Sequence, residues 1–128
     1  MIDHAGISVS DFAQSHDFYR AALEPLGVTV QMEVTAEQTG GPAFTGFGTE
    51  GKPFFWIGTG VAVSRGTHVA FAAASRSEVD AFHAAAMAAG GRDNGGPGLR
   101  PQYHPDYYGA FVHDPDGNNI EAVCHRPE

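Results

Sequence analysis

Hydrophobic and polar residues are arranged along the first half of the chain in a way that separates strands from one helix. Residues 2–9 alternate with a period of two, which is typical of a strand with one packed face. Asp11 matches the start of a capping box, and apolar residues then recur at helical spacing until Pro25 and Gly27. Glycine-rich turns separate three further apolar segments, at residues 28–34, 43–48 and 54–57. The first half therefore predicts a βαβββ unit.

The second half repeats this order of elements. Residues 68–74 alternate as a strand, and Ser75 begins a second capping-box pattern before a helical apolar stripe that a Gly-Gly pair ends. A long loop rich in glycine and proline is expected over residues 94–105. The chain should then close with a hairpin. Its strands are expected at residues 107–113 and 118–124, with an Asp-Pro-Asp-Gly turn between them at residues 114–117.

An offset of 64 residues places His4 over His68 and aligns the two halves. The identity between the halves is low, so chance similarity is the alternative to duplication, and the shared order of elements is the stronger argument. We therefore expect one α+β domain, residues 1–128, built from two βαβββ modules at residues 1–63 and 64–128.

Composition and charge exclude several classes of protein. The chain has 128 residues, 42% of them hydrophobic, which is enough for the core of one globular domain. Fifteen acidic residues outweigh seven basic ones, and the net charge of −8 argues against binding of nucleic acid through its phosphates. The single cysteine, Cys124, has no internal disulfide partner and is expected on a buried strand. Since no signal-like or membrane-spanning apolar run occurs, we expect a cytoplasmic protein that does not contact a membrane.

Three side chains are candidate metal ligands because each is expected on the strand face opposite the packed side: His4, His68 and Glu121. A glutamate facing inward from a sheet is costly to ionise without a partner, so it requires a metal or a hydrogen-bond network. Two imidazoles and one carboxylate suit a divalent transition metal and leave positions free for water or substrate. The alternative is that His4 and His68 bond only to backbone groups in a metal-free pocket.

A polar and aromatic loop before the last hairpin supplies candidates for proton transfer and substrate contact. His104 is a candidate acid, base or hydrogen-bond donor, and Tyr107 and Tyr108 are candidates to transfer a proton or orient a substrate. The alternative interpretation of this loop is a rigid structural role, and that of Trp56 is packing in the core. The residues expected to line a substrate pocket are Trp56, Arg100 and Tyr103.

Four segments of the chain resemble the vicinal oxygen chelate superfamily, which includes glyoxalase I, extradiol dioxygenases, fosfomycin-resistance proteins and bleomycin-resistance proteins. The segments are Ile2-Asp3-His4, residues 11–19, Thr67-His68-Val69-Ala70-Phe71, and Asp114-Pro115-Asp116-Gly117-Asn118-Asn119-Ile120-Glu121. The resemblance covers nearly the whole chain. It implies two βαβββ modules that form an open, cupped sheet around a pocket, the glyoxalase/bleomycin resistance/dihydroxybiphenyl dioxygenase fold, completed by a homodimer.

The same resemblance implies metal ligands at the ends of the first, fourth, fifth and eighth strands. His4, His68 and Glu121 match the first, fifth and eighth, whereas the fourth strand, around Trp56, carries no glutamate, glutamine or histidine. The four-ligand site of glyoxalase I is therefore not matched. The remaining set is similar to the iron site of extradiol dioxygenases or to the three-ligand site of fosfomycin-modifying enzymes. Neither match is complete, because the chain has only two modules and few arginines near the expected pocket.

Two functions from different classes follow. The first is a small-molecule metalloenzyme in which a divalent metal, Fe, Mn, Zn or Ni, chelates substrate oxygens as a Lewis acid in a lyase, isomerase or dioxygenase reaction. The second is a metal-free protein that binds or sequesters a small molecule, as bleomycin-resistance proteins do. Both functions lead us to expect a homodimer, because the edges of such small sheets are commonly covered by a partner.

Overall fold

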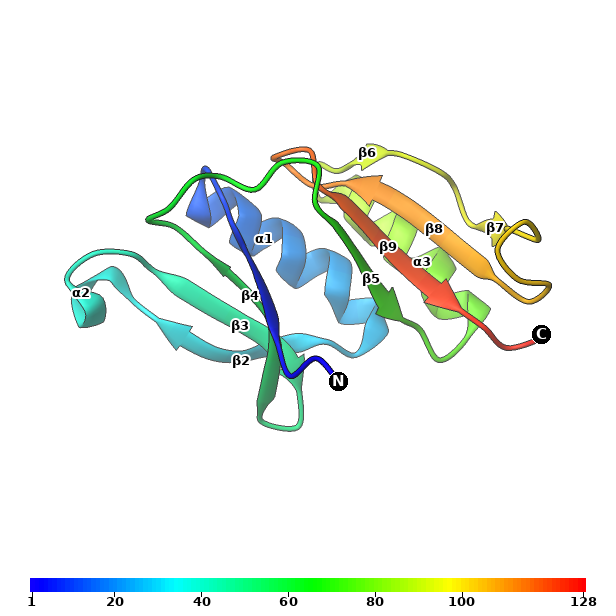
Figure 1. Cartoon of the computed structure of the whole chain (residues 1–128), viewed down its shortest axis with the longest axis horizontal. Coiled ribbons are helices and arrows are strands. Elements are labelled where there is room, and N and C mark those ends of the chain that lie inside the picture. The colour runs from blue at the N-terminus through cyan, green and yellow to red at the C-terminus, as the bar shows by residue number, and fades with distance from the viewer.

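The chain folds into two successive units, each a mixed sheet with one long helix (Figure 1). The computed structural model describes residues 1–128. The first unit contains β1 (Ala5–Ser8), α1 (Phe12–Leu23), a short 3₁₀ helix (Glu24–Leu26), β2 (Thr29–Val34), α2 (Ala36–Thr39), β3 (Phe44–Thr49) and β4 (Lys52–Gly58). The second contains β5 (His68–Ala72), α3 (Arg76–Ala88), β6 (Arg92–Asp93), β7 (Gly98–Leu99), β8 (Tyr108–His113) and β9 (Asn119–Cys124).

The two sheets share one topology. The first has the strand order β1-β4-β3-β2 and the second β5-β9-β8-β6, with β7 added beside β8. In each sheet the first strand of the unit pairs in parallel with the last, β1 with β4 and β5 with β9. All other pairs are antiparallel. The α+β class predicted from the sequence is therefore confirmed.

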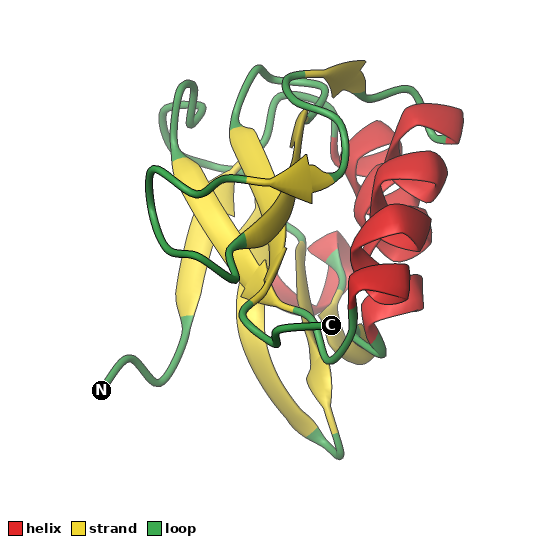
Figure 2. Ribbon diagram, turned by 90° about the vertical axis from the view of Figure 1, so that its right-hand side faces the viewer, coloured by secondary structure: helices red, strands yellow, loops and turns green.

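Both long helices lie on the same side of the sheets (Figure 2). The core fills the space between helices and strands, and aromatic rings connect the two units: Phe55 of β4 and Phe71 of β5 meet edge to face, with 5.2 Å between ring centroids. The other side of each sheet is left for a site, because the helices do not cover it. Neither helix is long and apolar enough to cross a membrane.

Some local predictions differ from the structure. β1 begins at Ala5 rather than at residue 2, because its pairing with β4 starts there. A helical turn, α2, was not predicted; it begins after Thr35, which forms a complete capping box. β4 begins at Lys52, because the turn is made by Glu50 and Gly51, both with positive φ. Part of the expected loop at 94–105 forms β7, which pairs with β8.

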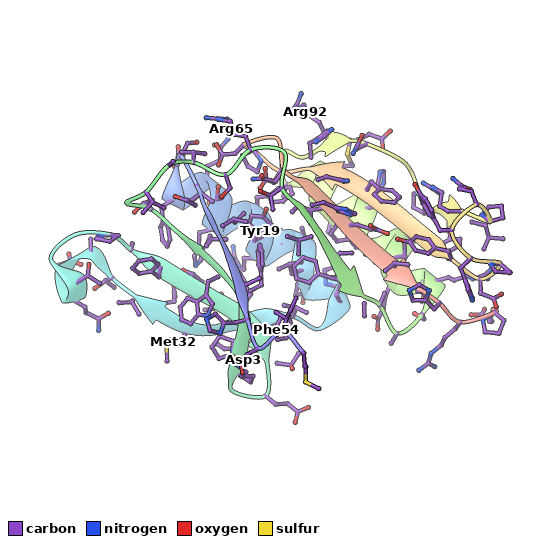
Figure 3. The ribbon with its side chains drawn as sticks, viewed as in Figure 1. Asp3, Tyr19, Met32, Phe54, Arg65 and Arg92 are labelled. Atoms are coloured by element: carbon purple, nitrogen blue, oxygen red, sulfur yellow. The ribbon has the colours of Figure 1, made fainter.

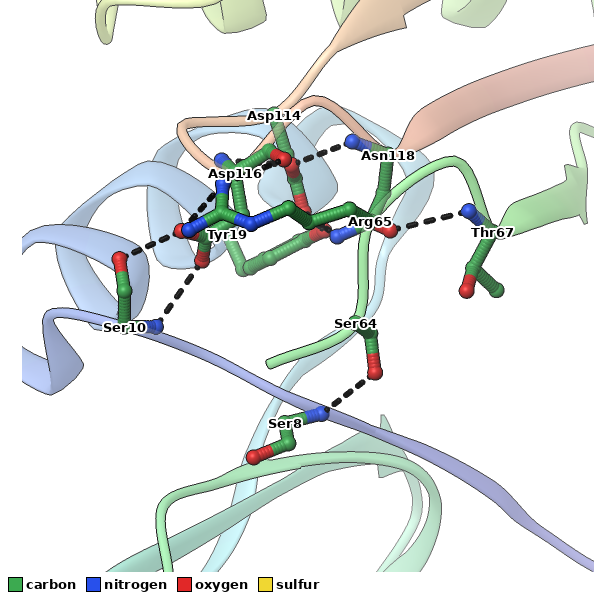
Figure 4. Close-up of polar contacts among 9 residues, drawn as sticks. All are labelled: Ser8, Ser10, Tyr19, Ser64, Arg65, Thr67, Asp114, Asp116 and Asn118. Atoms are coloured by element: carbon green, nitrogen blue, oxygen red, sulfur yellow. Dashed lines mark hydrogen bonds and ion pairs between the residues drawn. The ribbon is translucent and has the colours of Figure 1, made fainter. Parts of the chain in front are cut away.

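The turn between β8 and β9 is tied to the first unit by two buried aspartates (Figure 4). Asp114 accepts hydrogen bonds from the Tyr19 hydroxyl of α1 and from the backbone and side-chain N–H groups of Asn118. Asp116 accepts from the backbone N–H and the hydroxyl of Ser10, which lies just before α1. These contacts join residues about a hundred positions apart, so the turn fastens the second unit to the first.

Tyr19 is expected to make the fold less stable in alkaline solution. Burial, followed by the negative charge of Asp114, raises the pKa of Tyr19 well above its ordinary value of 10.0. Above pH 10.0, the ordinary pKa of a tyrosine, the unfolded chain loses this phenol proton while the folded chain keeps it. The free energy of unfolding therefore falls as pH rises. In Tyr19→Phe the fall should be shallower, by up to about 1.4 kcal/mol per pH unit, in urea denaturation at a series of alkaline pH values. Tyr103→Phe, at an exposed side chain, should keep the wild-type slope, and an unchanged slope in Tyr19→Phe would contradict this role.

Candidate functional site

A buried carboxylate lies on the open face of the second sheet. Glu121 is on β9, where its neighbours in the sheet are Ala70 of β5 and Phe111 of β8. Ile120 and Ala122, on either side of it in sequence, are packed in the core, so the alternation of a strand directs Glu121 to the opposite face. Glu121 is nevertheless 0% exposed. An ionised group so far from water needs compensating partners.

Two side chains supply those partners. His68 Nε2 lies 2.7 Å from Glu121 Oε1, and because an ionised carboxylate only accepts hydrogen bonds, the imidazole N–H donates. The Tyr107 hydroxyl donates to the other oxygen, Oε2. Burial, followed by the hydrogen bond to Glu121, raises the pKa of Tyr107 to about 12, so the phenol keeps its proton at neutral pH. The carboxylate is thus held at both oxygens.

These groups line a pocket of about 360 Å³, a volume typical of small-molecule sites. Tyr103 and Tyr107 form one wall, with 5.1 Å between their ring centroids, and Phe111 lies 6.4 Å from the His68 ring. The His68 side chain is 52% exposed and is therefore accessible from the pocket. The arrangement suits a small molecule with an apolar body and a polar group that reaches the imidazole.

The types of ligand atom in this pocket suit a divalent transition metal. An imidazole nitrogen and a carboxylate oxygen are ligands that Fe, Mn, Zn and Ni accept, and in the His68–Glu121 pair these two atoms are already neighbours. Within one chain, no three His, Cys, Asp or Glu side chains come together as a group that could hold an ion. The pair therefore offers two of the three ligands predicted from the sequence.

His4, the third predicted ligand, lies just before β1 in the other unit. Its Nδ1 is 2.8 Å from the carboxylate of Asp3, which also accepts from Lys52 Nζ at 2.7 Å. Figure 3 shows Asp3 at the lower end of the first sheet, whereas Arg65, which precedes β5, lies at the upper edge of the molecule. The two histidines that the internal alignment superimposes therefore stand apart in a single chain, because β1 and β5 begin at opposite ends of the molecule (Figure 1).

Trp56 and Arg100 do not line this pocket. Trp56 is on β4 and lines a separate pocket on the first sheet. The Arg100 guanidinium donates to two carbonyl oxygens of its own loop and lies 5.3 Å from the centre of the Phe111 ring. Arg100 thus supports the loop and one wall, while Tyr103 is the predicted substrate-pocket residue that lies beside His68.

Tyr108 and His104 also lie outside the pocket. Adjacent residues of a strand point to opposite faces, so Tyr107 and Tyr108 diverge. The Tyr108 hydroxyl donates to Asp80 of α3 at 2.6 Å, on the side covered by the helices. His104 is exposed, and its Nδ1 accepts from the backbone N–H of Asp106 at 3.0 Å. Of the predicted proton-transfer residues, the structure brings only Tyr107 to Glu121.

Phe111 is a pocket residue that was not predicted from the sequence. It stands directly opposite Glu121 in the β8–β9 ladder, so the two side chains share one face. The signal that could have identified it is the turn at residues 114–117, because the turn sets the pairing of the hairpin. The Asp114 N–H donates to the Asn118 carbonyl and closes the turn, so counting outward from these two residues places residue 111 opposite residue 121.

Comparisons with known proteins identify the family of this chain. A family model described as the Glyoxalase/Bleomycin resistance protein/Dioxygenase superfamily matches residues 1–122. Among solved structures, a glyoxalase/bleomycin resistance protein from Albidiferax ferrireducens is 34% identical, with a TM-score of 0.76 over 99% of both chains. No curated protein matches the chain.

Two less similar structures share the fold. An enzyme of the glyoxalase/bleomycin resistance protein/dioxygenase family from Burkholderia phytofirmans is 18% identical, with a TM-score of 0.68 over 97% of this chain and 98% of its own. Glyoxalase I from Zea mays is 20% identical, with a TM-score of 0.70. That match covers 99% of this chain and 45% of the maize chain, so the present chain spans less than half of its length. The chain belongs to the Glyoxalase/Bleomycin resistance protein/Dioxygenase superfamily.

Proposed function

We propose that this protein is a glyoxalase-like small-molecule metalloenzyme in which His68 and Glu121 bind a divalent metal, Fe, Mn, Zn or Ni. The observation that carries the proposal is the fully buried Glu121 carboxylate, 2.7 Å from His68 Nε2, in the wall of a pocket of about 360 Å³. When bound, such a metal supplies a Lewis acid for two oxygens of a substrate. The reaction is of the lyase, isomerase or dioxygenase type.

The chain's own residues have distinct parts in this proposal. To hold a metal, His68 would carry its ring proton on Nδ1 instead of Nε2, which would leave Nε2 free as the ligand atom beside Glu121. Tyr107 keeps its phenol proton and orients Glu121 through Oε2. Tyr103 and Phe111 supply apolar walls that exclude water from a bound substrate.

The third ligand in the proposal is His4 of the partner subunit in a homodimer. β1 and β5 are the edge strands of their sheets, and each has one unpaired side. Between them lies a cleft of about 350 Å³ whose lining residues are all hydrophobic, among them Ala5, Phe54, Val69 and Phe71. An apolar cleft beside open strand edges is typical of a surface that a second copy covers. The match to 45% of maize glyoxalase I also supports a second unit, because that chain is long enough for one.

Metal titration tests the proposal. Protein purified without chelator and titrated calorimetrically with Mn²⁺, Fe²⁺, Ni²⁺ or Zn²⁺ is expected to bind at least one of these metals. His68→Ala and Glu121→Gln should each lower that affinity by about 100-fold or more, since each removes a ligand. His83→Ala is the matched control and should bind as the wild type does, because His83 also pairs with a carboxylate, Asp93 at 2.9 Å, but outside the pocket. Absence of binding with all four metals would overturn the proposal.

One observation favours a second candidate function, a metal-free protein that binds or sequesters a small molecule. Both oxygens of Glu121 already have protein donors, so the buried charge is compensated without a metal. This candidate predicts protein without stoichiometric metal and a ligand affinity that a chelator does not change. The same titration therefore separates the two functions.

A further inference from the structure

A row of polar side chains crosses the open face of the second sheet. His68 of β5 lies beside Asn119 of β9, which lies beside His113 of β8. His113 is paired in turn with Arg92 on the outer strand, β6. Residues paired across a sheet point to one face, and Asn119 is two positions from Glu121 on the same strand, so the row shares the face of Glu121. None of its four side chains is acidic.

Arg92 is a cation that no carboxylate of the chain neutralises. The next residue, Asp93, pairs with His83 of α3 at 2.9 Å and so points to the helix side, which directs Arg92 to the open side. The Arg92 side chain is exposed and takes part in none of the ion pairs of the chain. Figure 3 shows Arg92 at the upper edge of the molecule, as it does Arg65, but Arg65 lies 3.8 Å from the carboxylate of Asp116.

Asn119 and His113 add hydrogen-bonding groups that the fold does not use. The Asn119 side-chain oxygen accepts from Nδ2 of Asn94 at 3.2 Å, which leaves the Asn119 amide N–H groups to donate elsewhere. His113 Nδ1 is buried and has no partner. Buried polar atoms nearly always have a partner, so an unpaired one marks a place where a ligand can bind. Both residues are half-buried, where a hydrogen bond is stronger than in open water.

The row lies beside the pocket but outside it. Asn119, His113 and Arg92 are not among the residues that line the pocket of His68, whereas Phe111 is. His113 is two positions after Phe111 on β8, and a strand rises about 3.4 Å per residue, so about 7 Å separates them. Strands are about 4.8 Å apart, which places His113 about 10 Å from His68 across the sheet. A molecule whose apolar body lies on Phe111 therefore reaches the row through a short chain.

We propose that Arg92, His113 and Asn119 form an anion subsite, and that the substrate of the neighbouring pocket is a small organic acid. Its carboxylate is joined to the apolar body by a short chain and is bound at this row, away from the oxygens that a metal would bind. The inference rests on the proposed function, because it names the substrate class of that same site. One arginine balances the single charge of a carboxylate, whereas a phosphate monoester carries nearly two at neutral pH.

Calorimetry on the full chain with EDTA present tests the subsite without a metal. The probe is 4-phenylbutyrate, which has a phenyl ring for the pocket walls and a carboxylate on a short chain. It is expected to bind at least about fivefold more tightly than 4-phenylbutanamide, which has the same shape but no charge. Benzoate, whose carboxylate is too close to the ring to reach the row, should bind more weakly. No binding of 4-phenylbutyrate, or equal affinity for the acid and the amide, would overturn the proposal.

A charge-removing variant locates the carboxylate. Arg92→Gln should reduce the preference for the acid over the amide by about threefold or more and leave the affinity for the amide unchanged. In the wild type, added NaCl should weaken binding of the acid, and this salt dependence should be lost in Arg92→Gln. Arg20→Gln is the matched control, because Arg20 is also an exposed arginine outside the ion pairs of the chain but lies on α1, and it should bind both probes as the wild type does.

Nuclear magnetic resonance supplies a second readout at the row. In ¹H–¹⁵N spectra, the Asn119 side-chain amide signals should shift to saturation with the acid and much less with the amide. Equal losses of acid binding in Arg92→Gln and Arg20→Gln would show that only net charge matters and would contradict the subsite. These measurements contain no metal, so their failure would leave the metal-site proposal standing, and failure of the metal titration would leave these results unchanged.

Discussion

Asp114→Ala is expected to lower the free energy of unfolding by about 3 kcal/mol or more. Asp114 is 1% exposed, and its carboxylate accepts four hydrogen bonds, from the Tyr19 hydroxyl, the Asn118 side-chain amide and the backbone N–H groups of Asp116 and Asn118. Alanine would leave these donors without that acceptor in a site closed to water. Each buried donor that loses its partner costs about 1–3 kcal/mol.

Urea denaturation at neutral pH measures this loss as a lower midpoint at nearly constant slope. Asp114→Asn should fall between the wild type and alanine, because its one carbonyl oxygen still accepts from the backbone of the turn. Asp17→Ala is the control, since Asp17 is also an aspartate of the folded chain but is exposed on α1, and it should change stability little. Equal midpoints for Asp114→Ala and Asp17→Ala would show that the turn does not fasten the two units.

A mixture of two variants that each fail to bind metal is expected to regain metal sites. If His4 of the partner subunit completes the site, His4→Ala chains still carry His68 and Glu121, and Glu121→Gln chains still carry His4. A mixed dimer then has one complete site, with two ligands from the first chain and one from the second. Random association of equal amounts makes half of the dimers mixed, so about a quarter of all sites should bind metal.

The control mixture combines His68→Ala with Glu121→Gln. Both substitutions affect the same pair, 2.7 Å apart on one sheet, so no mixed dimer has a complete site and no metal should be recovered. Metal content after co-refolding and gel filtration gives the measurement for both mixtures. Full metal binding by His4→Ala alone, or no recovery in the first mixture, would contradict a site shared between two chains.

The terminal hairpin and the helix starts could be predicted because their determinants are local. Asp11 and Ser75 accept from the backbone N–H groups of the residues three positions on, as their capping patterns predict. The turn at residues 114–117 lies between β8 and β9 as expected. By contrast, β7 depends on a loop folding back onto β8, and a glycine- and proline-rich segment carries no periodicity from which to predict that.

For the site, the sequence predicted on which face of its strand each side chain lies, but not which side chains of other strands lie beside it. The alternation of residues around His68 and Glu121 is enough to assign each to the side away from the core. The parallel β5–β9 pairing then brings them within 2.7 Å, although 53 residues separate them. Phe111 joins this pair through the β8–β9 ladder, and Tyr107, just before β8, joins it through its hydroxyl, whereas Tyr108 turns toward α3.

The sequence by itself determined the order of the elements, the helix caps and the strand faces, because these follow from spacing over a few residues. Only the tertiary structure decided that His68 and Glu121 share a pocket while His4 lies in the other unit. The physical reason is that contacts between distant residues, such as Ser10 with Asp116 and Phe55 with Phe71, set how the units are placed. No local pattern encodes such contacts, since each depends on the packing of the whole chain.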